Sequence, residues 1–84
     1  MYYVYILLDV QNEFYTGYCE DLKVRFSQHN HGLVFATKGK LPVELIYYEA
    51  CINKYDAVKR EKYLKSGPGK KYLKNRLKNY LKSE

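Results

Sequence analysis

Apolar residues gather in short segments of the chain, and three of these segments predict β-strands. Residues 2–8 (YYVYILL) and 14–19 (FYTGYC) are rich in aromatic and β-branched side chains, as strands usually are. The residues between them, 9–13, have a length typical of a hairpin loop. A third segment of the same kind, residues 43–50 (VELIYYEA), predicts another strand.

The first predicted helix spans residues 22–31, because Asp21 can cap its first turn and Gly32 can end it. On this helix Arg25 and His29 lie one turn apart, and both can lean over the sheet. The alternative for each is ordinary: Arg25 extends into solvent, and His29 sits near the negative end of the helix dipole.

Two further helices are predicted in the C-terminal part of the chain. Asn53 can cap a helix over residues 54–66, which Gly67 and Pro68 would end. Residues 69–82 repeat apolar side chains at helical spacing and are strongly basic on their other sides.

The chain of 84 residues is expected to form one domain, residues 1–84, of the α/β class (α+β type). The predicted order is β-β-α-β-α-α, with a small three-stranded, mostly antiparallel sheet flanked by three helices. No apolar run is long enough for a membrane span and no leader is apparent, so no membrane partner is expected. Cys19 and Cys51 are too few for a disulfide framework, which favours a reducing, cytoplasmic location.

The net charge of +6 is unevenly distributed along the chain. Residues 1–50 contain four Lys/Arg and six Asp/Glu, whereas residues 51–84 contain eleven and three. A basic half favours a polyanion such as nucleic acid, or an anionic membrane surface. A solvated, lysine-rich helix face explains the charge equally well.

One acidic residue lies where the helical pattern places an apolar stripe. Ala57, Val58 and Leu64 form this stripe, and Glu61 falls in its middle. A carboxylate that faces a core needs a cation, a metal ion or a hydrogen-bond network. Glu61 is therefore either a functional carboxylate or a structural one, in a salt bridge or at the wet edge of the stripe.

The first two strands place tyrosines where they can meet. Because side chains alternate along a strand, Tyr3, Tyr5 and Leu7 share one face, and Tyr15 and Gly17 share a face of the second strand. If the hairpin brings these faces to one surface, two hydroxyls lie beside the gap at the glycine. Cross-strand packing of aromatic rings is the structural alternative.

Five segments of the chain have a characteristic order and spacing: VYI (residues 4–6), YTG (residues 15–17), DLKVRFSQHNHG, LIYYEA and DAVKREKYLKSG. In this order they resemble the two signature tripeptides, the arginine helix, the third strand and the glutamate helix of the GIY-YIG nuclease superfamily. The resemblance covers the chain from Tyr3 to around Leu81 and is closest to the small stand-alone members. It implies an endonuclease, a hydrolase that acts on phosphodiester bonds.

The resemblance implies a role for each candidate site residue. Tyr5 and Tyr15 would be the paired signature tyrosines, Arg25 the phosphate-contacting arginine and Glu61 the metal-binding carboxylate. His29 matches a histidine that is present in some members. Glu61 would hold one Mg²⁺ (or Mn²⁺). Tyr5 would accept the proton of the attacking water, directly or through His29, and Arg25 would stabilise charge on the phosphoryl oxygens.

The same reading predicts a nucleic-acid partner, DNA rather than RNA, held mainly by its phosphates. Asn75 would be the counterpart of a polar residue that some members supply from beyond the glutamate helix. The expected contacts are Gly17, Thr37, Lys38, Lys40, Lys70, Lys71, Lys74, Asn75 and Lys78. No base-reading module is recognisable, so nucleic-acid shape, a homodimer or a protein partner would supply specificity.

Two other functions are open. Tyr18 stands where several DNA-repair members have lysine, which favours a catalytically weak or inactive nucleic-acid-binding module with tyrosines as stacking platforms. A protein-interaction module would instead dock its basic face on an acidic partner. The sequence does not choose between DNA repair, recombination and defence against foreign DNA.

Overall fold

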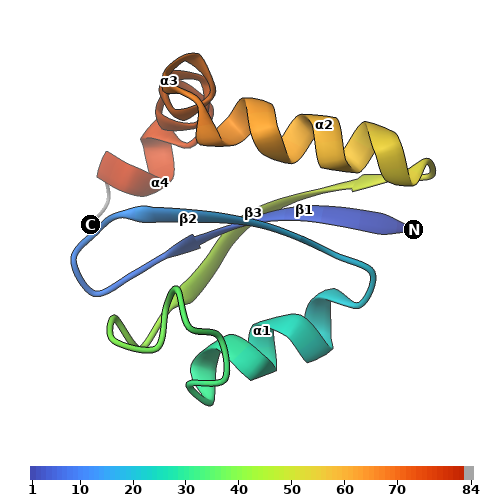
Figure 1. The fold of residues 1–84 in the computed structure, drawn as a ribbon. Helices are drawn as coiled ribbons and strands as arrows, with labels where there is room; N and C mark the ends of the chain where they lie inside the picture. Colours follow the sequence, from blue (N-terminus) through green and yellow to red (C-terminus); the bar gives the residue numbers. More distant parts are fainter. Residues whose placement is uncertain (83–84) are drawn as a thin grey trace.

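A computed structural model describes residues 1–82 of the chain. It shows a three-stranded sheet with α1 on one face and the other helices on the opposite face (Figure 1). The order is β-β-α-β-α-α-α, so the expected fold class is confirmed, with one helix more than expected. The elements are β1 Tyr2–Leu8, β2 Phe14–Cys19, α1 Leu22–Asn30, β3 Glu44–Cys51, α2 Lys54–Lys65, α3 Gly67–Arg76 and α4 Lys78–Lys82.

The sheet has the strand order β2-β1-β3, and both neighbouring pairs are antiparallel. In the hairpin, Tyr5 pairs with Gly17 and Leu7 pairs with Tyr15. β1 is therefore the central strand, covered on both faces, while β2 and β3 form the edges. Within residues 1–82 there is no helix long and apolar enough to cross a membrane.

Alternation along β1 divides the core into two clusters, one on each face of the sheet. The cluster that joins the sheet to α2 and α3 consists of Val4, Ile6, Ala57, Leu64 and Leu73. The cluster on the α1 face consists of Tyr5, Leu7, Cys19 and Val43. The expected division of the β1 side chains between two faces is confirmed.

Side-chain caps begin α1 and α2, as the sequence indicates. Oδ1 of Asp21 accepts a hydrogen bond from the N–H of Val24 at 3.1 Å, and Oδ1 of Asn53 accepts one from the N–H of Tyr55 at 2.8 Å. Just beyond α1, Gly32 has a φ of 74°, a left-handed conformation that costs glycine little.

The C-terminal helices correct two expectations. Gly67 and Pro68 begin α3 and do not end α2, because Ser66 both closes α2 and caps α3 with its hydroxyl. A proline in a first turn loses no helical hydrogen bond. The single helix expected over residues 69–82 is divided into α3 and α4 at Leu77, whose φ of −106° and ψ of 17° leave the helical region.

The loop over residues 32–42 is tied back to α1. The side chain of Asn30 donates to the backbone oxygen of Val43 at 3.2 Å and accepts from its N–H at 3.0 Å. Inside the loop, the N–H of Thr37 donates to the backbone oxygen of Val34 at 3.2 Å. The side chain of Thr37 is buried and contacts His29 of α1.

Candidate active site

Tyr5 lies at the centre of the cluster on the α1 face. Its side chain is 1% exposed, and it extends over Gly17, its partner residue in β2. A Cβ at position 17 would overlap with the ring and the hydroxyl of Tyr5. Gly17 therefore leaves the gap that allows the phenol to lie across β2, an edge strand.

A chain of side-chain hydrogen bonds begins at the Tyr5 hydroxyl. Oη of Tyr5 is 2.8 Å from Nε2 of His29, and Nδ1 of His29 is 2.8 Å from Oγ1 of Thr37. Nε of Arg25 donates to the same Tyr5 oxygen at 3.4 Å. Because His29 and Thr37 are 0% and 2% exposed, the chain runs through the protein interior. Arg25 and His29 both lean over the sheet, the arrangement that their spacing allowed.

Tyr15 packs beside these hydrogen-bonded side chains, on the same face of the sheet as Tyr5. The centroid of its ring is 6.3 Å from that of Tyr5 and 5.0 Å from that of His29. Tyr15 and Arg25 are partly exposed, whereas Tyr5 and His29 are buried. A substrate that approaches this surface would meet Tyr15 and Arg25 first.

Burial changes the acid–base properties of the Tyr5–His29 pair. Desolvation raises the pKa of Tyr5 to about 12, although the hydrogen bond from Arg25 opposes the shift. Desolvation, with a smaller contribution from the charge of Arg25, lowers the pKa of His29 to about 4. In the free protein at neutral pH, Tyr5 is therefore a neutral phenol and His29 a neutral imidazole.

Glu61 belongs to α2, which covers the opposite face of the sheet (Figure 1). Its side chain is 20% exposed, and its Oε2 lies 3.1 Å from Nζ of Lys65. Among residues 1–82, no hydrogen bond or ion pair joins Glu61 to Tyr5, Arg25 or His29. The structure thus brings together four of the five expected catalytic residues and places the carboxylate in the other layer.

A divalent cation would find one carboxylate here and no preformed cage. The described part of the chain contains no group of three or more His, Cys, Asp or Glu side chains that could share a metal ion. Glu61 is partly exposed and can supply one oxygen ligand once Lys65 releases it. A hard cation that keeps several waters, such as Mg²⁺, suits a site with one carboxylate.

Comparison with known proteins identifies the family. The model of the GIY-YIG catalytic domain matches residues 1–76. The chain belongs to the GIY-YIG family of nucleases. The resemblance inferred from the sequence is confirmed.

Several UPF0213 proteins are similar in sequence to this chain. The one from Lacticaseibacillus paracasei is 40% identical over 65 residues, which are 76% of this chain and 73% of that protein. The one from Clostridium perfringens is 42% identical over 66 residues, 77% and 71% of the two chains. A solution NMR structure of the UPF0213 protein from Bacillus halodurans matches with a TM-score of 0.56 and 34% identity, covering 87% of this chain and 82% of that one.

The loop residues expected at the nucleic acid have different surroundings in this GIY-YIG chain. Thr37 lies in the interior and not on the surface, because its hydroxyl is the partner of the buried histidine. Nζ of Lys40 is 3.5 Å from Oε1 of Glu13 and 3.9 Å from Oδ2 of Asp9, so its charge is already paired. Lys38 is exposed.

The basic residues of α3 and α4 face solvent. Those expected to contact nucleic acid, together with Asn75 on α3, are all exposed: Lys70, Lys71, Lys74, Asn75 and Lys78. Lys70 and Lys74 line a cleft of about 510 Å³ whose other side is formed by the hairpin at Asn12 and Phe14. The helix α3, which supplies these two lysines, lies on the same side of the sheet as α2, which carries Glu61 (Figure 1).

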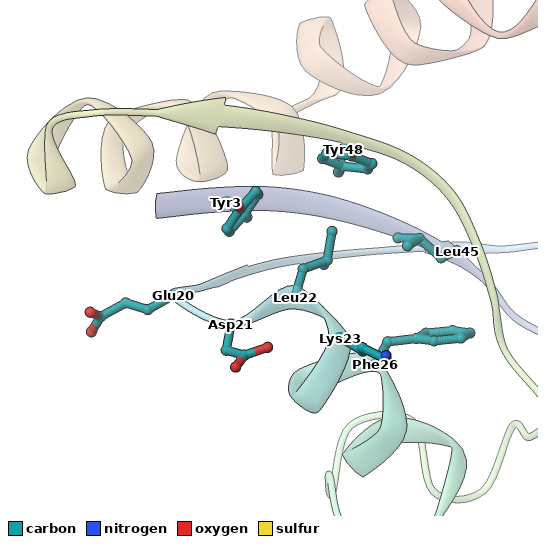
Figure 2. A pocket seen from close by; sticks show the side chains of 8 residues that line it. All are labelled: Tyr3, Glu20, Asp21, Leu22, Lys23, Phe26, Leu45 and Tyr48. Atoms are coloured by element: carbon teal, nitrogen blue, oxygen red, sulfur yellow. The ribbon is translucent and has the colours of Figure 1, made fainter. Parts of the chain in front are cut away.

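A groove of about 620 Å³ opens between α1 and β3. Figure 2 shows its aromatic and aliphatic residues, Tyr3, Leu22, Phe26, Leu45 and Tyr48, and the acidic pair Glu20 and Asp21 at one end. The hydrogen-bonded residues Tyr5, Arg25, His29 and Thr37 do not line this groove. Because two of its three charged residues are acidic, this groove does not suit a phosphate.

Sequence reasoning missed the part that Thr37 plays in the site. Thr37 is eight residues from His29, and no local periodicity links a loop residue to a helical one. The available signal is weak: Thr37 is the polar residue that ends the otherwise apolar stretch LVFA. The hydrogen bonds between Asn30 and Val43, thirteen residues apart, could not be predicted from a local sequence pattern either.

Proposed function

We propose that the protein is a metal-dependent endonuclease that hydrolyses phosphodiester bonds in DNA. The observation that carries the proposal is the hydrogen-bonded Tyr5–His29 pair beside Arg25, in a chain of a nuclease family. A phenol and an imidazole in contact can pass a proton, and an adjacent guanidinium suits an anionic substrate. Both cysteines are free thiols, which supports a reducing, cytoplasmic location.

Substrate binding would make this proton mobile. In the free protein the proton stays on Tyr5, because the pKa of its phenol, about 12, lies far above the pKa of the His29 imidazole, about 4. A phosphate bound to Arg25 would neutralise the guanidinium and place negative charge near His29, which raises the pKa of the imidazole. Tyr5 would then accept the proton of the attacking water as it gives its own to His29.

Arg25 and Tyr15 would hold the reacting phosphate. Both are partly exposed at the mouth of the buried pair. The guanidinium of Arg25 would stabilise the charge that develops on the phosphoryl oxygens. The hydroxyl of Tyr15 would donate a hydrogen bond to phosphate or water and fix the direction of attack.

Glu61 would hold a divalent cation, Mg²⁺ or Mn²⁺, from the other side of the edge strand β2. α2 packs against β2 from one face, while Tyr5 lies across β2 on the other. A phosphate bound along this edge would meet both groups. The cation would supply electrostatic stabilisation of the phosphate charge.

The exposed lysines of α3 and α4 would add contacts to the DNA backbone. Such contacts give affinity that falls with salt and is independent of sequence. A homodimer or a protein partner would then supply specificity.

The test compares the wild type with Glu61→Gln on a panel of labelled DNA and RNA structures, with Mg²⁺, with Mn²⁺ and with a chelator. The expected result is metal-dependent cleavage by the wild type and none by Glu61→Gln, with affinities within about twofold of each other. Glu44→Gln, which changes an exposed carboxylate on β3, serves as the matched control and should cleave normally.

A second candidate is a nucleic-acid-binding module without turnover. The raised pKa of Tyr5 favours it, since a protonated phenol is not a base. In the same experiment this candidate predicts binding by both proteins and cleavage by neither, a result that would refute the nuclease proposal.

A further inference from the structure

We infer that His29 carries its proton on Nδ1, that Thr37 accepts this proton and stabilises the tautomer, and that Nε2 is therefore the acceptor of the Tyr5 proton. His29 has two contacts of 2.8 Å, from Nε2 to Oη of Tyr5 and from Nδ1 to Oγ1 of Thr37. Both partners are hydroxyls, which can donate or accept. The distances alone therefore permit two opposite directions for the chain of hydrogen bonds.

Arg25 decides the direction at Tyr5. A guanidinium can only donate, so the Tyr5 oxygen accepts the hydrogen bond from Nε of Arg25 at 3.4 Å. Among the hydrogen bonds of residues 1–82, Oη of Tyr5 has two partners, this nitrogen and Nε2 of His29. The phenol is protonated at neutral pH because burial raises its pKa. Its proton therefore points to Nε2, which must be unprotonated.

The position of the second proton follows from the charge of His29. Burial lowers the pKa of this imidazole to about 4, so at neutral pH it carries one proton, which lies on Nδ1. Nδ1–H then donates to Oγ1 of Thr37. The loop holds this acceptor in place, since Thr37 donates its N–H to Val34 at 3.2 Å and its backbone oxygen accepts from Lys40 at 2.9 Å.

The other tautomer would obstruct the proposed chemistry. It would direct Nε2–H at the Tyr5 oxygen, leave the phenol proton without an acceptor and remove the lone pair that receives the proton. Thr37 acts on the reaction only through His29 and is a positioning residue. This kinetic role rests on the proposed nuclease function, whereas the tautomer assignment does not.

The direct test is a nitrogen-15 NMR spectrum of the two imidazoles at neutral pH. The protein contains two histidines. His31 is exposed, and its Nδ1 lies 2.7 Å from the backbone oxygen of Ser27, so it is an internal reference that His31→Gln identifies. The expected wild-type spectrum shows His29 protonated on Nδ1. A His29 that carries its proton on Nε2 would overturn the inference, and no substitution is needed to observe it.

Substitutions at Thr37 test its part in this assignment. Thr37→Val keeps the shape and removes the acceptor, so the tautomer ratio of His29 should shift about tenfold toward Nε2–H, the effect of one lost hydrogen bond. Thr37→Ser should keep the wild-type ratio, and Thr37→Ala replaces Thr37→Val should the latter fail to fold. A ratio that does not change when the hydroxyl is removed would overturn the inference.

Kinetics separate the positioning role from the function itself. With the substrate that the wild type cleaves best, Thr37→Val should lower kcat about tenfold at unchanged KM, and Thr37→Ser should restore it. An unchanged kcat would overturn the positioning role. A wild type that cleaves nothing would refute the nuclease proposal and with it this role, while the spectra would still decide the tautomer.

Discussion

The two faces of the sheet are built on different principles. On the α2–α3 face the centre is apolar, with Ile6, Leu64 and Leu73 fully buried. On the α1 face, which we call the polar face, the apolar cluster also encloses the hydroxyl of Tyr5 and the imidazole of His29, which are buried and bonded to each other. Burying polar groups costs desolvation even when they are paired. The first face thus supplies stability, and the second holds functional groups in a fixed arrangement.

The polar groups of the α2–α3 face lie at its rim, where they join α2 to β3. Nε and Nη2 of Arg60 donate to the two oxygens of Glu49 at 2.8 and 2.9 Å, and the hydroxyl of Tyr47 donates to the same carboxylate at 2.9 Å. The hydrogen bond from Arg60 lowers the pKa of Glu49. Arg60 and Glu61 are neighbours in α2, yet the first joins the helix to β3 while the second has only the flexible Lys65 as an ion-pair partner among the described residues.

The largest effect is expected from Gly17→Ala, a substitution that would disturb the packing of Tyr5 on the polar face. The new methyl group would overlap with Tyr5, which is buried and hydrogen-bonded and cannot move freely. We expect a loss of about 1–3 kcal/mol in the free energy of unfolding and a fall of about 100-fold or more in cleavage rate. Gly39→Ala meets nothing within 4 Å and is the control, to be compared by urea unfolding and single-turnover cleavage. Equal results for both variants would contradict the packing described for Tyr5.

Acid should weaken the polar face through His29. Its pKa is about 4 in the folded protein and about 6.5 when unfolded, so between these values the unfolded chain binds the extra proton. The contribution of neutral His29 to the free energy of unfolding is therefore fully present above pH 6.5. It should fall by on the order of 3 kcal/mol as the pH drops to 4. The titratable groups that face this imidazole are Tyr5, Tyr15 and Arg25.

Urea unfolding from pH 7 to pH 4 measures this effect. His29→Gln should show a flatter dependence than the wild type, and His31→Gln, which changes the exposed histidine, should keep the wild-type slope. A His29→Gln protein with the full slope would assign the acid sensitivity to other groups.

On the apolar face, Arg60→Ala should reduce stability without reducing cleavage. The change leaves a partly buried carboxylate without its two charged hydrogen bonds, which costs about 1–2 kcal/mol for groups that retain some solvent. Lys59→Ala alters the exposed residue beside it and should be near neutral. If the cleavage rate of Arg60→Ala fell along with its stability, the result would argue against separate roles for the two faces.

The smallest effect is expected at the ion pair of Glu61. Lys65→Met removes the cation that competes for the proposed metal ligand. Because an exposed pair contributes at most about 1 kcal/mol, the Mg²⁺ concentration for half-maximal cleavage should fall by about fivefold at most. Lys62→Met, on the same helix and also exposed, should leave it unchanged. A higher Mg²⁺ requirement in Lys65→Met would mean that the lysine assists the site.

Local patterns predicted the strands, the caps at Asp21 and Asn53, and the shared surface of Tyr5 and Tyr15. These features follow from alternation and capping, which act over a few residues. The break at Leu77 was not foreseeable, since the apolar spacing continues through it. The burial of Thr37 was not foreseeable either, because it depends on how a loop folds back against α1.

The most direct measurement is the single-turnover cleavage rate of Tyr5→Phe, with DNA affinity measured in parallel. This variant keeps the ring over Gly17 and removes only the hydroxyl that joins His29 and Arg25. If Tyr5 transfers the proton, cleavage falls by about 100-fold or more while affinity is unchanged, and Tyr48→Phe, at an exposed tyrosine of β3, behaves as the wild type. A Tyr5→Phe protein that cleaves at the wild-type rate would contradict a catalytic role for the polar face.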